Sequence, residues 1–82
     1  MLGPDNLNDL DTPEPILSLP GLSVDLSRGE QGTYYEITAE REAFNTVADI
    51  IAALLLLPQD ALMRDAFSYP DGICINFWKE VA

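Results

Sequence analysis

The chain has 82 residues, of which 48% are hydrophobic, and 14 Asp and Glu against 4 Lys and Arg give a formal net charge of −10. This length allows one small domain, and the apolar content is too high for a disordered chain. The charge disfavours nucleic acid and anionic membranes as partners and favours a basic protein surface. It also serves solubility, and composition alone leaves both interpretations open.

The sequence contains one cysteine, Cys74, and no histidine. No intramolecular disulfide can form, and serine and cysteine triads and most zinc and iron sites are excluded. No basic and apolar leader is present near the start, and the apolar run 50–57 is too short to cross a bilayer. We therefore expect a cytoplasmic protein with no membrane partner.

Residues 1–21 form an acidic segment without a basic residue. It contains four prolines, which disfavour a helix or a central strand: Pro4, Pro13, Pro15 and Pro20. We expect this segment to be partly extended or disordered, with disorder in the first ten or so residues and Ile16 to Leu19 extended over the body. Residues 22–82 are expected to form a single α+β domain.

The domain begins with a pattern typical of a β-hairpin. From Leu22 to Ser27, apolar and polar residues alternate strictly, as in a half-buried strand. Gly29 and Gly32 then supply turn geometry, and the segment from Thr33 to Thr38 is rich in β-formers. We therefore expect two antiparallel strands joined by this turn.

Two helices are expected next. Thr38 can cap a long helix that ends before Pro58, because Leu57 is pushed out of helical geometry by the proline that follows it. A shorter helix from about Pro58 to Phe67 would then follow. The core stripe of the long helix is expected at six positions with helical spacing: Phe44, Val47, Ala48, Ile51, Leu54 and Leu55.

The chain closes with a second alternating segment. Tyr69-Pro70-Asp71-Gly72 is a strong turn signal, and residues 73–81 alternate in hydropathy, which indicates a final strand. The elements together predict an α+β fold with a small three-stranded sheet, built from a β-hairpin, a long helix, a short helix and a C-terminal strand, with the helices on one face.

No residue pattern indicates catalysis, a metal or a cofactor. The carboxylate run from Asp5 to Asp11 does not fit a calcium loop, since Leu7 and Leu10 occupy positions that need a ligand and a glycine. Gly29 and Gly32 are not followed by the lysine of a phosphate loop. We therefore expect a protein that is not an enzyme.

Two surfaces are candidates for binding a partner. Alternation places aromatic and acidic side chains together on the outer face of the sheet, where they would repel nucleic acid but suit a protein interface: Asp25, Tyr34, Glu36, Trp78 and Glu80. The second surface contains Leu56, which cannot share the buried helix face with Leu55. Either the N-terminal segment and the short helix cover Leu56, or a second copy or a partner does.

These features favour a small acidic inhibitor or regulator that binds a basic nucleic-acid-binding protein by mimicking the charge of nucleic acid. In size and charge the chain resembles the small phage and mobile-element proteins that block restriction or CRISPR effectors, such as anti-CRISPR and anti-restriction proteins. The alternative is a non-catalytic subunit or adaptor, such as an antitoxin, an immunity protein or a small chaperone, that assembles through its apolar helix. A homodimer is left open by either hypothesis.

Overall fold

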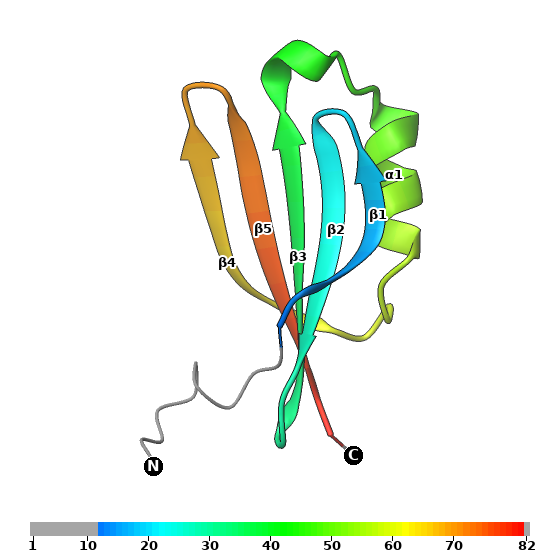
Figure 1. The fold of residues 1–82 in the computed structure, drawn as a ribbon, viewed down its shortest axis with the longest axis vertical. Helices are drawn as coiled ribbons and strands as arrows, with labels where there is room; N and C mark the ends of the chain where they lie inside the picture. The colour runs from blue at the N-terminus through cyan, green and yellow to red at the C-terminus, as the bar shows by residue number, and fades with distance from the viewer. Residues whose placement is uncertain (1–11, 82) are drawn as a thin grey trace.

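The computed structural model describes residues 12–81, which form one antiparallel five-stranded sheet with one α-helix (Figure 1). The elements in chain order are β1 (Glu14–Leu19), β2 (Leu22–Arg28), β3 (Gly32–Glu40), a 3-10 turn (Arg41–Ala43), α1 (Val47–Leu55), β4 (Leu62–Tyr69) and β5 (Gly72–Glu80). The strand order is β1-β2-β3-β5-β4. Figure 1 shows α1 beside β1, at the end of the sheet away from β4.

The predicted three-stranded sheet with a long and a short helix is wrong. The hairpin and the final strand are present as β2, β3 and β5, but two more strands complete the sheet. The stretch expected as a short helix is instead β4, paired with β5 through the tight turn at Pro70 and Asp71. A tight two-residue turn of this kind joins two antiparallel strands. The segment before Pro70 is therefore a strand, like the segment after Asp71.

The N-terminal segment contributes the first edge strand. β1 pairs antiparallel with β2, with Leu17 opposite Val24 and a register shift between Pro15 and Leu17. Residues Ile16 to Leu19, which were expected to lie over the body of the domain, therefore belong to an edge strand of the sheet. A proline fits this edge, because its missing N–H removes no bond from an inner ladder. The expected disorder of the first ten residues lies outside the described residues.

Helix α1 begins later and is shorter than expected. Thr38 belongs to β3, and Thr46 caps the helix. The Asp49 backbone N–H donates to Thr46 Oγ1 at 3.2 Å, and the Thr46 N–H donates to Asp49 Oδ2 at 2.9 Å. This reciprocal capping box satisfies two backbone donors that would otherwise lack a partner at the helix start.

The buried face of α1 also differs from the expected stripe. Ile50, Ala53 and Leu54 face the core, and Leu57 follows them just beyond the helix. Of the six predicted positions only Leu54 packs there, and Phe44 is 87% exposed in a left-handed conformation before the helix. Nearly every side chain of α1 is apolar, so periodicity alone could not indicate which face is buried.

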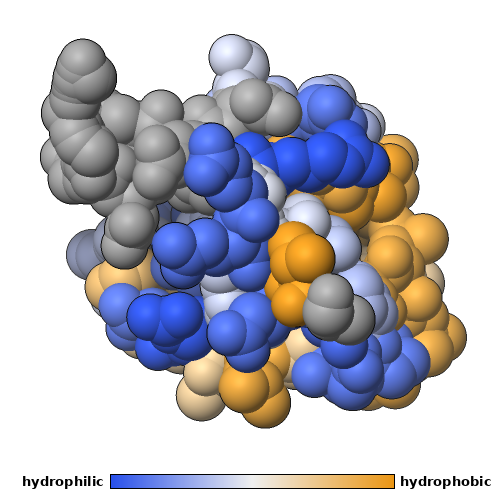
Figure 2. Space-filling model, turned by 90° about the horizontal axis from the view of Figure 1, so that it is seen from below, coloured by the Kyte–Doolittle hydropathy of each residue, from blue (hydrophilic) through white to orange (hydrophobic). Residues whose placement is uncertain are grey.

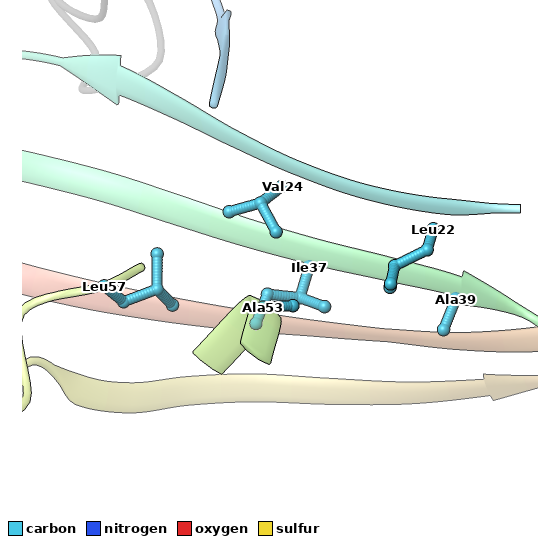
Figure 3. Close-up of a cluster of buried hydrophobic side chains, with 6 residues drawn as sticks. All are labelled: Leu22, Val24, Ile37, Ala39, Ala53 and Leu57. Carbon is cyan, nitrogen blue, oxygen red and sulfur yellow. The ribbon is translucent and has the colours of Figure 1, made fainter. Parts of the chain in front are cut away.

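The hydrophobic core lies between α1 and strands β2 and β3 (Figure 3). Its fully buried residues are Leu22, Val24, Ile37, Ala39, Ala53 and Leu57. Among the described residues α1 covers only this part of the sheet, and no element within residues 12–81 covers the face that points away from it. Within residues 12–81 no helix is long and apolar enough to cross a membrane.

Candidate protein-binding face

The open face is the side of the sheet that points away from α1. Residues directly opposite each other on neighbouring strands share a face. Asp25 lies opposite Glu36, Glu36 lies opposite Asn76, and Asn76 lies opposite Asp65. These four side chains lie in a line across β2, β3, β5 and β4. The three carboxylates in this line, Asp25, Glu36 and Asp65, are here called the acidic row.

Aromatic side chains lie next to the acidic row on the same face. Tyr34 is opposite Trp78, and Trp78 is opposite Leu62. The Trp78 ring lies over Gly32, where an added Cβ would come within 2.7 Å of it. Glu80, opposite Gly32, shares the face. The five sheet residues expected to project together are thus brought together by the register.

Two buried side chains, Cys74 and Asn76, lie beside Glu36 at the centre of this face. The Cys74 thiol donates to Glu36 Oε2 at 3.1 Å, and Cys74 and Asn76 are 5% and 4% exposed. Burial raises the pKa of the Cys74 thiol above its usual 9.0, and the hydrogen bond to Glu36 raises it further. The thiol is therefore held in its neutral form as a donor to the carboxylate, which is the opposite of what a nucleophile needs.

Tyr34 is held neutral in the same surroundings. Burial raises the pKa of its phenol above 10.0, and the negative charge of Glu36 adds to this effect. A phenol that stays protonated keeps a hydrogen-bond donor available at the rim of the acidic row. This suits recognition of a polar or charged group on a partner.

The two ion pairs of the described residues do not involve the acidic row. Arg28 pairs with Glu14 at 2.9 Å, and Lys79 pairs with Asp60, which lowers the pKa of the Asp60 carboxyl. Strand alternation places Arg28 and Lys79 on the α1 side of the sheet. Within residues 12–81 no carboxylate of the acidic row forms an ion pair.

The described part of the chain holds no cluster of metal ligands. It contains no group of three His, Cys, Asp or Glu side chains placed to hold a metal ion. An open hollow of about 410 Å³ lies at the end of the sheet near the start of α1, lined in part by Ile50, Tyr69 and Ile73. Its charged lining residues are Glu40 and Arg41, and the hydroxyl-bearing residues Ser68 and Tyr69 also line it.

Leu56, the sixth predicted site residue, lies apart from the open face. It follows the last residue of α1 and is 48% exposed, on the other side of the sheet. The predicted site is therefore two surfaces and not one. Sequence reasoning missed Asp65 and Leu62, because both fall in the segment expected as a helix.

The acidic row is expected to cost stability. Asp25 and Glu36 are directly opposite, and like charges in that position destabilise a sheet by roughly 0.2 to 1 kcal/mol. Glu36→Gln should therefore raise the midpoint of thermal unfolding by a few degrees, measured by circular dichroism. Glu30→Gln, in the exposed turn after β2, is the control that should leave it unchanged. A lower midpoint for Glu36→Gln alone would contradict repulsion in the row.

No protein-family model matches the chain, and neither curated proteins nor solved structures provide a match.

Proposed function

We propose that this chain is a non-catalytic inhibitor or regulator that binds a basic protein through its open face. The observation that carries the proposal is the acidic row, whose three carboxylates lie on one face and form no ion pair with any residue from 12 to 81. Unpaired like charges side by side are unfavourable in the free protein. A partner with basic side chains would relieve that repulsion on binding.

The composition of the open face supports a protein as the partner. Tyr34 and Trp78 supply aromatic area beside the carboxylates, and such side chains are favoured anchors at protein interfaces. Nucleic acid would meet only negative charge on this face. Neighbouring strands lie about 4.8 Å apart, so Asp25 and Glu36 lie on adjacent strands, and Asn76 on β5 separates Glu36 from Asp65.

The partner that fits this pattern best is a protein whose basic groove normally holds nucleic acid. In this role the chain competes with nucleic acid for the groove. The test uses a panel of purified basic nucleic-acid-binding proteins, each bound to a labelled oligonucleotide. The chain is added, and fluorescence anisotropy measures displacement of the oligonucleotide. The chain should displace the oligonucleotide from at least one protein, and displacement should weaken steeply as salt rises.

Charge reversal on the open face is expected to abolish this competition. Glu36→Lys with Glu80→Lys should raise the concentration needed for displacement at least about 10-fold, because charge pairs across an interface can be worth several kcal/mol. The control is Glu30→Lys with Glu42→Lys, two exposed positions outside the strands. Both double variants change the formal charge from −10 to −6, since each substitution adds two charges. Equal weakening by both would contradict a role for this face.

A further inference from the structure

The outer face of α1 is apolar and uncovered. The side chains that point away from the core include Val47, Ile51, Leu55 and Leu56, which are 75%, 49%, 65% and 48% exposed. Figure 2 shows hydrophobic surface gathered on the side where α1 lies in Figure 1. A helix that is apolar all round is normally buried on all sides, so this face is built to be covered.

Two ion pairs lie on the α1 side of the sheet. On the α1 side of the sheet Arg28 is paired with Glu14 and Lys79 with Asp60, so these four charges cancel. Within α1 the one charged residue is Asp49, which is engaged in the helix cap. The negative charge of the sheet is thus concentrated on the open face, and the α1 side offers no row of carboxylates to a basic partner.

We propose that the outer face of α1 binds a second copy of this chain, with the two helices antiparallel across a two-fold axis. With the axis between Ile51 and Ala52, Leu55 of each copy packs on Ala48 of its partner, and Ile51 packs on Ala52. Large side chains then meet small ones, which lets the helices approach closely. The same residues serve both copies, as a two-fold interface requires.

Charge favours a second copy bound through α1 over one bound through the open face. Contact through the open faces would bring two acidic rows together. Contact through α1 places the two open faces on opposite outer surfaces, separated by both sheets and both helices. Each chain also has a small core for its length, and small domains of this kind are often stabilised by association.

Oligomeric state in solution provides the first test. In sedimentation equilibrium at about 100 μM, where a Kd near 1 μM leaves most chains paired, the wild type should have twice the 9.0 kDa mass of one chain. Leu55→Lys should return the mass to that of one chain. Leu62→Lys is the matched control, because Leu62 is 68% exposed, close to the 65% of Leu55, but lies on the open face. It should remain a dimer.

Cross-linking tests the position of the axis in case Leu55→Lys is poorly folded. In a Cys74→Ser background, Ala52→Cys should form a covalent dimer on mild oxidation, whereas Ser23→Cys on the open face should not. A wild type that is monomeric at this concentration would overturn the proposal, as would cross-linking at Ser23→Cys but not at Ala52→Cys. The proposed role of the open face is tested separately, since its charge-reversal variant keeps α1 intact.

Discussion

Ile37→Ala is expected to lower the free energy of unfolding by about 2 to 5 kcal/mol, the usual cost of cutting a buried isoleucine to alanine. Ile37 is 1% exposed and lies in the middle of β3, opposite Val24 on β2 and Ile75 on β5. It belongs to the cluster that packs under Ala53 and Leu57 (Figure 3). With so few fully buried residues in the core, the cavity left by the missing side chain is a large fraction of it.

Phe44→Ala is the comparison that makes this prediction specific. Phe44 is larger than Ile37 but is 87% exposed, so its truncation should change stability by no more than about 0.5 kcal/mol. Urea unfolding followed by circular dichroism measures both variants. An equal cost for the two would mean that Phe44 is buried in solution. Sequence periodicity had placed Phe44 and Ile51 in the core, and neither belongs to it.

Gly21→Ala should destabilise the protein by about 1 to 3 kcal/mol, because two separate costs add. Gly21 has a φ of 75°, a conformation that side chains disfavour. An added Cβ would also lie 2.2 Å from the Cβ of Ala43 in the 3-10 turn. The Gly21 carbonyl accepts hydrogen bonds from the Glu40 N–H at 2.8 Å and from Asn45 Nδ2 at 3.0 Å. A shift of residue 21 away from Ala43 would disturb both bonds at this junction.

A double variant separates the two costs at this junction. In an Ala43→Gly background the Cβ that clashes is gone, so adding Gly21→Ala should cost only the conformational part, about 1 kcal/mol. The two backgrounds are compared by the midpoint and slope of urea unfolding. An unchanged cost of Gly21→Ala in both backgrounds would show that the close approach of the turn to residue 21 does not occur in solution.

The two proposed surfaces would work together in a simple way. A dimer through α1 leaves both open faces exposed and pointing outward, so one assembly presents two acidic rows. Such an assembly can bind two basic partners, or two sites on one partner, and so gain avidity without further contacts. In these two proposals the charge of the open face and the apolar outer face of α1 would have separate roles, which the variants of each face test separately.

Several local features could be predicted from the sequence because short-range chemistry controls them. Strict alternation identified β2 and the final strand, and the two glycines identified the turn between β2 and β3. The absence of histidine excluded serine and cysteine triads and most zinc and iron sites. The faces of these strands also followed from alternation. This is why Asp25, Tyr34, Glu36, Trp78 and Glu80 could be assigned to one face before the strand order was known.

Three features depend on tertiary contacts and could not be predicted: the identity of β4, the phase of α1 and the membership of Asp65 in the acidic row. The spacing of Leu62, Met63, Ala66 and Phe67 fits a helix, yet these residues form an edge strand because pairing with β5 satisfies their backbone groups. Helix α1 is apolar on nearly every side. Its buried face therefore depends on the start of the helix at the Thr46 cap and on the apolar side chains of the sheet against which it packs. Short-range patterns contain no information on long-range strand pairing or on packing. The identity of β4 and the place of Asp65 depend on strand pairing, and the phase of α1 depends on packing.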